Sequence, residues 1–304
     1  MNKLAAVLLL SIFLLTSCVP AAPRQQDEFV IIATLFPQYD FAREIAGDKA
    51  KVRLLMPPGA ESHAYEPSPS DIIAINEADV FLYTGEFMET WAHRIIEGID
   101  GNVIVVDVSE GLELSAPEDP VDGHGHGGLS FDPHIWTDPV MATAMVVNIE
   151  KALCAADPSN ALTYSENADA YIKKLEKLDS GFKKLTEGSS ENKIYFGGRF
   201  AMSYFAKRYG LVCESAFDSC SAESEPSAQR VAELIDEMKK TGASVVFYEE
   251  LADPKIARTI AEATGTDMLL LHSCHNLSRE EFESGESYLS LMERNLEHLQ
   301  KALD

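Results

Sequence analysis

One long amphipathic helix, predicted over Pro158–Glu187, separates two similar halves of this chain. Apolar residues recur within it at spacings of four and three, with charged residues between them: Tyr164, Ala168, Tyr171, Leu175, Leu178, Phe182 and Leu185. At about 1.5 Å per residue such a helix is about 40 Å long, and Gly188 is placed to end it. A helix of this length is predicted to connect two lobes, and its stiffness limits how far they can open.

On both sides of this helix, short apolar runs alternate with helical stretches of about ten residues. Continuous runs rich in β-branched residues are typical of strands buried on both faces of a parallel sheet. The predicted strands are Phe29–Phe36, Val52–Met56, Val80–Tyr83, Val103–Val108, Lys193–Phe196, Leu211–Glu214, Ser244–Glu249 and Met268–Leu271. The shorter predicted helices are Pro37–Ala46, Asp71–Ala78 with Ser70 as its cap, Glu89–Glu97, Pro139–Ala155, Ala201–Tyr209, Ser227–Lys240, Pro254–Ala263 and Glu286–Leu303. The predicted fold class is α/β, with two lobes that each hold a parallel sheet and flanking helices.

The N-terminus resembles a bacterial lipoprotein signal. Lys3 precedes the apolar run Leu4–Leu15, which is shorter than the about 20 residues of a membrane-spanning helix, and Leu-Thr-Ser-Cys ends at Cys18. The resemblance implies that Cys18 is diacylated, becomes the mature N-terminus and anchors an extracytoplasmic protein to the bacterial cell membrane. A plain signal peptide cut nearby is the alternative. The expected organisation is a signal peptide at 1–18, a tether at 19–28, a first lobe at 29–157, the connecting helix at 158–187 and a second lobe at 188–304.

The charge and the cysteines narrow the class of protein. A formal net charge of −24 argues strongly against nucleic acid or an anionic lipid surface as partner and is compatible with attracting cations. Cys18 is one of five cysteines, and the other four form no Cys-x-x-Cys pair: Cys154, Cys213, Cys220 and Cys274. They are too few for a disulfide scaffold, although an extracytoplasmic compartment permits one pair.

The stretch FDPHIWTDP, residues 131–139, holds His134 in a structured turn. Asp132-Pro133 favours an extended approach, and Thr137 or Asp138 can cap a helix whose first residue is Pro139. An imidazole fixed in this way is suited to bind a metal. The alternative is a turn histidine that is satisfied by a backbone carbonyl.

Other histidines also follow predicted strands. His63 lies in the loop after Val52–Met56, while His272 and His275 follow Met268–Leu271. Ligands of parallel α/β sheets bind beyond the carboxyl ends of the strands. Neutral imidazoles that converge there suit zinc, and manganese or nickel less strongly.

Four motifs give the chain a resemblance to a known family. PPGAESHAYEPSPSDIIAINEADVFLYTG, FDPHIWTDP, YFAKRYGL and YLSLMERNL, in this order, resemble the metal-binding class of ABC-transporter substrate-binding proteins, the zinc and manganese uptake lipoproteins. The resemblance implies two α/β lobes joined by one long helix, with one metal in the cleft between them. It also implies a monomer that delivers this metal to a membrane permease powered by an ATPase. An adhesin role is known for some members of this family.

The resemblance also implies a ligand set, with one departure. His63 and His134 match the first two ligands, His272 aligns with the fourth, and Arg199 occupies the position of the third. A guanidinium stays protonated and has no lone pair to donate. Arg199 must therefore turn away, hold an anion that completes the site, or pair with a carboxylate such as Glu225 or Glu249, which we favour.

Other side chains could complete or surround this metal site. His275 or Cys274 could replace the missing ligand, and a thiolate would favour zinc over manganese; a disulfide from Cys274 to Cys220 is the alternative. Glu61 could accept a histidine N–H or be exposed, while Tyr65 and Trp136 are expected to form walls of the cleft. His124 and His126 resemble a very short form of the His-rich loop of zinc members, or belong to a solvated loop.

These observations predict a binding protein for Zn²⁺ and not an enzyme. Binding of Mn²⁺, of an anion or of a metal chelate is an alternative because of Arg199. A secreted mononuclear zinc hydrolase is an alternative of another class, since three His ligands with an open position can activate water. The chain has neither a His-Glu-x-x-His motif nor an evident general base beside the histidines, which argues against the hydrolase.

Overall fold

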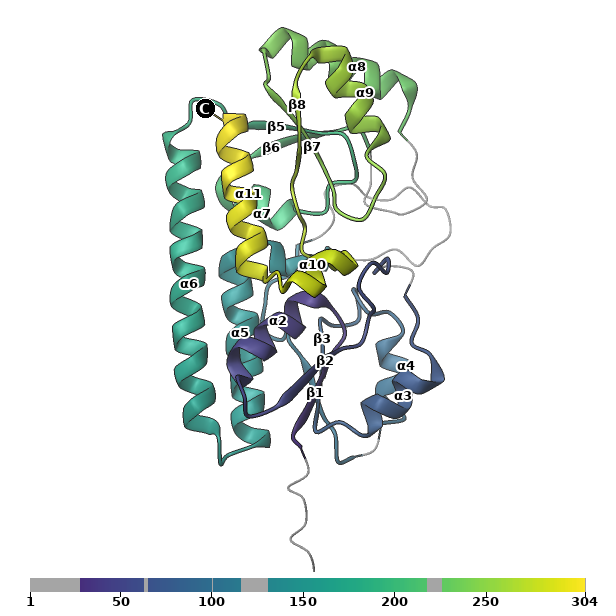
Figure 1. Ribbon diagram of the computed structural model, residues 1–304, viewed down its shortest axis with the longest axis vertical. Coiled ribbons are helices and arrows are strands. Elements are labelled where there is room, and N and C mark those ends of the chain that lie inside the picture. Colours follow the sequence, from purple (N-terminus) through teal and green to yellow (C-terminus); the bar gives the residue numbers. More distant parts are fainter. Residues whose placement is uncertain (1–27, 63–64, 100, 116–130, 218–225, 304) are drawn as a thin grey trace, which may run out of the picture.

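The computed structural model describes residues 28–62, 65–99, 101–115, 131–217 and 226–303. Figure 1 shows two lobes stacked along the long axis. The first lobe contains β1 (Val30–Ala33), α2 (Phe36–Ala46), β2 (Lys51–Leu54), α3 (Pro69–Asn76), β3 (Val80–Tyr83), α4 (Ala92–Ile96), β4 (Ile104–Asp107), the 3₁₀ turn η1 (Ile135–Thr137) and α5 (Pro139–Ala156). The second contains β5 (Lys193–Phe196), α7 (Ser203–Tyr209), β6 (Val212–Ser215), α8 (Ala228–Thr241), β7 (Val245–Tyr248), α9 (Lys255–Thr264), β8 (Asp267–Leu270), α10 (Arg279–Ser284) and α11 (Tyr288–Leu303).

Each lobe is built on a parallel sheet, and both sheets have the same strand order. The orders are β2-β1-β3-β4 and β6-β5-β7-β8, and every described strand pairing is parallel. The central strands β1, β3, β5 and β7 are the most deeply buried, as their continuous apolar sequences require. Parallel strands place their carboxyl ends at one edge of a sheet, so the loops after the strands of each lobe gather at a common edge.

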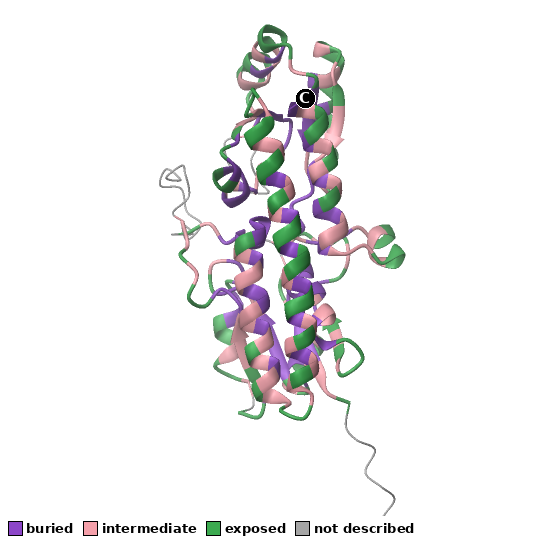
Figure 2. Ribbon diagram, turned by 90° about the vertical axis from the view of Figure 1, so that its left-hand side faces the viewer, coloured by how far each residue is buried: buried purple, intermediate pink, exposed green. Residues whose placement is uncertain are grey.

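The long helix α6 (Ala161–Gly188) runs along both lobes, as the sequence predicts. Its predicted apolar stripe is buried from Tyr164 to Phe182, and it packs on α2 and α5 of the first lobe and on α7 and α11 of the second. Figure 2, which looks at the α6 side, shows exposed residues along the outward stripe of this helix. The helix begins three residues later than predicted because Asp157 organises a turn at the end of α5. The Asp157 carboxylate accepts hydrogen bonds from Ser159, Asn160 and Tyr164 at 2.6–2.8 Å.

One apolar core extends through both lobes. It joins residues such as Ile31 and Phe41 of the first lobe to Phe196 and Phe247 of the second, with Phe182 of α6 in the same cluster. Two smaller clusters lie on the other faces of the sheets. Helix α5 has the length and mean hydropathy of a membrane span, but it packs on α6 and α2 and contributes to this core.

Several predicted boundaries are corrected by the structure. The run Phe29–Phe36 forms a strand only over Val30–Ala33, because Gln38 binds the Leu35 N–H and starts α2 at Phe36. Of the two caps predicted for α5, Thr137 and Asp138, Asp138 is the one observed, and its carboxylate accepts the Val140 N–H at 2.8 Å. The short elements η1 and α10 were not predicted.

The predicted cap of α3 is wrong, because the cap is Ser68 and not Ser70. The Ser68 hydroxyl accepts the Asp71 N–H at 3.3 Å, and the Asp71 carboxylate accepts the Ser68 N–H at 2.8 Å. This reciprocal capping box starts the helix at Pro69.

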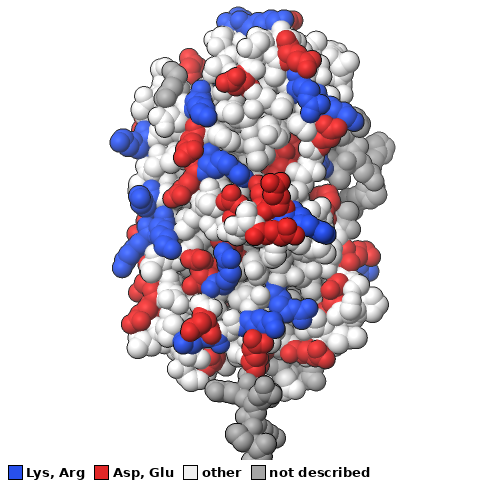
Figure 3. All heavy atoms as spheres, in the orientation of Figure 1, with Lys and Arg blue, Asp and Glu red and all other residues white. Residues whose placement is uncertain are grey.

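Charged side chains of both signs are interspersed on the face shown in Figure 3, with acidic side chains gathered at mid-height, where α10 lies. The face in view has no broad basic surface of the kind that binds nucleic acid.

Candidate metal centre

A cavity of about 110 Å³ lies where loops of the two lobes meet. The first lobe contributes Gly59–Ser62, from the loop after β2. The second contributes residues that follow β5, β7 and β8, among them Arg199, Glu249, Glu250 and His275. The cavity therefore lies beyond the carboxyl ends of strands in both sheets, where the sequence predicts the ligands to gather.

His134 is held rigidly at the start of η1. Its side chain is buried, and its Nδ1 lies 2.6 Å from Asp132 Oδ1, which also accepts the His134 backbone N–H at 3.0 Å. Burial opposes ionisation of Asp132, but the hydrogen bonds from His134 outweigh it and hold the pKa of the Asp132 carboxyl below its ordinary value. A neutral imidazole that donates its Nδ1–H to Asp132 keeps a lone pair at Nε2, which is the atom able to bind a metal.

His275 is the histidine of the last loop that meets His134. The two ring centroids are 4.5 Å apart, and both rings pack edge-on against Trp136. The Trp136 indole N–H donates to the Ser273 carbonyl at 2.8 Å, which fixes this loop of the second lobe to the first lobe. Trp136 is thus a fully buried support behind the two histidines.

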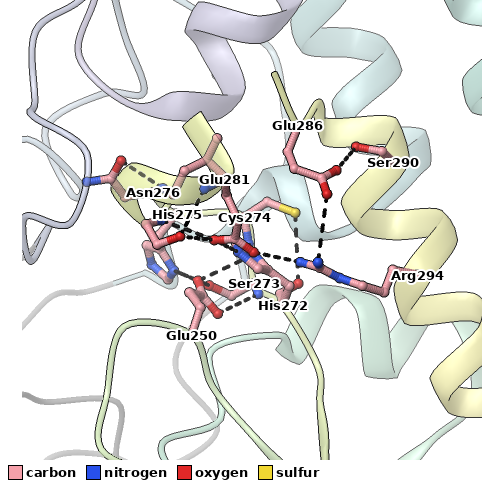
Figure 4. A network of polar contacts seen from close by, with 12 residues as sticks. Glu250, His272, Ser273, Cys274, His275, Asn276, Glu281, Glu286, Ser290 and Arg294 are labelled. Atoms are coloured by element: carbon pink, nitrogen blue, oxygen red, sulfur yellow. Dashed lines mark hydrogen bonds and ion pairs between the residues drawn. The ribbon is translucent and has the colours of Figure 1, made fainter. Parts of the chain in front are cut away.

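His272 points elsewhere, although the resemblance aligns it with a ligand. Its Nδ1 accepts the Cys274 N–H at 2.9 Å, and its Nε2 lies 3.8 Å from Glu281 Oε2 (Figure 4). The lone pair of this ring is therefore used by the backbone. The nearby His272 ring and the hydrogen bond from Arg294, at 2.8 Å, outweigh burial and hold the pKa of the Glu281 carboxyl well below its ordinary value.

The backbone at Cys274 explains why His272 and His275 diverge. Cys274 has φ +60°, in the left-handed region that a non-glycine residue adopts at a cost of about 1–3 kcal/mol. Its thiol is fully buried in the core cluster, and burial raises the pKa of this thiol well above its ordinary value. Cys274 is a free cysteine and does not line the cavity, so the structure supports neither the predicted disulfide nor a thiolate ligand.

Arg199 pairs with a carboxylate, as predicted. Its Nε donates to Glu249 Oε1 at 3.3 Å, and both side chains line the cavity. The Glu249 carboxylate lies against Gly198, where a β-carbon would come within 1.5 Å of Glu249 Oε2. A side chain at position 198 would therefore displace the Glu249 carboxylate from this place beside Arg199.

Some predicted residues lie outside the described part of the chain: Cys18, His63, His124, His126, Cys220 and Glu225. Glu61 lines the cavity, while Tyr65 packs on Trp91 and donates to Asp71 at 3.2 Å, away from the two histidines. Among the residues that the structure describes, no three His, Cys, Asp or Glu side chains form a ready metal cluster. His134 and His275 are the pair that it brings together.

Three residues that contact or support the two histidines were not predicted as part of the site: Asp132, Glu250 and Ser273. Asp132 could have been found, because it precedes His134 by two residues in the same turn. Glu250 follows a buried strand, which marks it as a residue of the edge where ligands bind. Ser273 carries no comparable sign in the sequence.

A family model described as zinc-uptake complex component A, periplasmic, matches residues 31–302. The chain belongs to this family. Zinc-binding lipoprotein AdcA of Streptococcus pneumoniae (strain ATCC BAA-255 / R6) is 36% identical over 282 residues, which are 90% of this chain and 56% of AdcA. The chain therefore spans little more than half of that relative. High-affinity zinc uptake system protein ZnuA of Bacillus subtilis (strain 168) is 34% identical over 289 residues, 93% of this chain and 90% of ZnuA.

Solved structures of this family have the same fold. The Zn(II)-bound ZnuA-like domain of Streptococcus pneumoniae AdcA has a TM-score of 0.76 at 34% identity, covering 91% of this chain and 99% of that one. Lmb of Streptococcus agalactiae, described as a bifunctional protein with adhesin and metal transporting activity, has a TM-score of 0.77 at 30% identity over 91% and 100%. The predicted family and fold class are confirmed. The zinc-uptake family consists of transport binding proteins, not enzymes, which argues against the hydrolase alternative.

Proposed function

We propose that this chain is the extracytoplasmic substrate-binding lipoprotein of an ABC uptake transporter, and that its cargo is Zn²⁺. The observation that carries the proposal is a pair of imidazoles whose ring centroids are 4.5 Å apart: His134, which is buried, and His275, which is largely buried and lines the cavity between the lobes. Membership of the zinc-uptake family and the zinc-bound relative support zinc over manganese as cargo. Cys18 would anchor the protein to the membrane, and the partners would be a permease and its ATPase.

We propose His63, His134 and His275 as the ligands, which leaves one position open for water or a further donor. Imidazole nitrogen is a preferred ligand of Zn²⁺, and neutral His ligands suit it better than Mn²⁺, which favours oxygen. The charges around the cavity also favour a cation, because Glu61, Glu249 and Glu250 outnumber Arg199. Since Arg199 already pairs with Glu249, an anion or metal chelate has less support as the cargo. No observation on this chain favours adhesion.

The test is metal content and thermal unfolding of the chain from Val19 onward with Zn²⁺ and with Mn²⁺. Binding stabilises the folded state by RT ln(1 + [L]/Kd), about 4 kcal/mol at a thousandfold excess over Kd. One equivalent of zinc and a large upward shift in Tm are expected. No shift with zinc would refute the function.

Substitutions test the ligands separately from the function. His63→Ala, His134→Ala and His275→Ala should each weaken zinc binding by about a hundredfold or more, because each removes a direct ligand. His93→Ala is the matched control, because that side chain is 73% exposed and pairs with Glu97 in the first lobe. Parent-like zinc affinity in the three variants would show that the ligand set is wrong even if zinc binds.

A further inference from the structure

The Ser273 hydroxyl links His275 to Glu250. His275 Nδ1 lies 2.5 Å from Ser273 Oγ, and Ser273 Oγ makes a short hydrogen bond to Glu250 Oε1 (Figure 4). Glu250 Oε2 also accepts the Ser273 backbone N–H at 2.9 Å, so both carboxylate oxygens are held by the same serine. All three side chains are largely buried, with 12% of the His275 side chain and 7% of the Glu250 side chain exposed.

The number of available hydrogens determines which group donates in the His275–Ser273 and Ser273–Glu250 hydrogen bonds. A carboxylate has no hydrogen to donate, so the single hydroxyl hydrogen of Ser273 goes to Glu250. Ser273 Oγ can then only accept from His275, which must carry its hydrogen on Nδ1. The lone pair of His275 is consequently on Nε2, as it is in His134, whose Nδ1 faces Asp132.

His272 provides an internal comparison three residues away. Its Nδ1 accepts the Cys274 N–H, so its hydrogen is on Nε2, the opposite tautomer. The tautomers of His275 and His272 differ because His275 Nδ1 faces the Ser273 hydroxyl, whereas His272 Nδ1 accepts a backbone N–H. Leu251, at φ +59°, and Cys274 are the non-glycine residues with positive φ among those described. They follow Glu250 and precede His275, so strained backbone brings these two loops together.

We propose that Glu250 and Ser273 are positioning residues that hold His275 in the tautomer and orientation required to bind the cargo metal. This inference rests on the proposed function. Metal-binding histidines generally donate their second N–H to a carboxylate, a carbonyl or water, which fixes the ring and raises its basicity. In this protein the Ser273 hydroxyl lies between the His275 ring and the Glu250 carboxylate, whereas the His134 ring contacts the Asp132 carboxylate directly. The two ligands thereby present equivalent Nε2 atoms to one ion.

The test reads the tautomer of His275 in the metal-free chain from Val19 onward. Long-range ¹H–¹⁵N correlation spectra are recorded with chelator at mildly alkaline pH, and the His275 signals are assigned by their loss in His275→Gln. The expected form in the parent is Nδ1–H. Ser273→Ala and Glu250→Gln should move it toward Nε2–H, the form that a solvated neutral imidazole prefers. Glu249→Gln is the matched control, since it removes the same charge from the same cavity and should leave His275 as Nδ1–H.

Zinc affinity completes the test. Ser273→Ala and Glu250→Gln should weaken zinc binding by about 10- to 100-fold. An Nε2–H tautomer in the parent overturns the inference even if neither variant folds, and so does equal zinc affinity in the parent and both variants. Absence of zinc binding by the parent itself instead refutes the proposed function, so the two failures are distinguishable.

Discussion

Glu89 should make the stability of the metal-free protein fall as the pH rises toward neutrality. Its side chain is buried beyond the carboxyl ends of the adjacent strands β1 and β3, where Thr34 and Thr84 follow the strands. Glu89 Oε2 accepts the Thr84 N–H at 3.0 Å, and Oε1 contacts the Thr34 hydroxyl and Gln38 Nε2. Burial outweighs these hydrogen bonds and raises the pKa of Glu89 from an ordinary value of 4.5 to about 7.

The sign and size of the effect follow from this pKa. A carboxyl group whose pKa is raised by folding favours the folded state while it is protonated, so its contribution is fully present below about pH 4.5. That contribution is lost as the pH rises through about 7. At about 1.4 kcal/mol for each unit of pKa, the loss amounts to about 3 kcal/mol. Glu89→Gln is uncharged at every pH, and its amide oxygen can still accept a hydrogen bond from Thr34 or Thr84. The variant should therefore lack this part of the pH dependence.

The assay is urea unfolding of parent and Glu89→Gln, with chelator, between about pH 5 and about pH 8. Chelator is needed because metal binding by histidines is itself pH-dependent. The free energy of unfolding of the parent should fall relative to that of Glu89→Gln by about 2.5 kcal/mol across this range, because part of the effect lies below about pH 5. Glu86→Gln, an exposed neighbour with the same change in charge, is the control and should follow the parent. Parallel profiles for the parent and Glu89→Gln would refute the reasoning.

Two further predictions concern Arg199 and the cap of α3. Arg199→His should tighten zinc binding by about tenfold or more, measured by isothermal titration calorimetry, because it replaces a cation beside Glu249 with a donor; no gain over Arg199→Gln would mean that charge removal alone is responsible. Ser68→Ala should lower the free energy of unfolding by about 1 kcal/mol, and Ser70→Ala by clearly less, because only Ser68 accepts the Asp71 N–H. Equal losses in urea unfolding would contradict the assigned cap.

The strand and helix alternation was predictable because continuous apolar runs have one stable environment, a sheet covered on both faces. The cap of α3 could also have been identified from the sequence, but the predicted cap, Ser70, was wrong. Ser68-Pro69-Ser70-Asp71 offers two possible caps, and the combination of Pro at the first helical position with an acid three residues after Ser68 identifies the correct one.

The candidate site was predictable only in part. Strand ends placed His272 and His275 in the correct loop, but the sequence does not reveal which of them faces the cavity. That choice depends on the left-handed backbone of Cys274, a conformation with no signature in a non-glycine residue. The pairing of Arg199 with Glu249 was predictable because a cation beside a metal site needs a counter-charge, whereas the role of Ser273 depends on geometry between separate loops.

The contacts behind the cavity indicate how cargo can enter and leave. Trp136 of the first lobe donates to Ser273 of the second at 2.8 Å, and the Tyr288 hydroxyl donates to the Trp136 carbonyl at 2.7 Å. The Tyr288 N–H donates to Asp40 at 2.9 Å. Separating the lobes would break these buried bonds, at about 1–3 kcal/mol for each unpaired group, and would open the apolar core that the lobes share. Glu61 and Ser62, in the loop after β2, line the cavity but lie outside this core, so exchange of the metal should depend on movement of that loop more than on separation of the lobes.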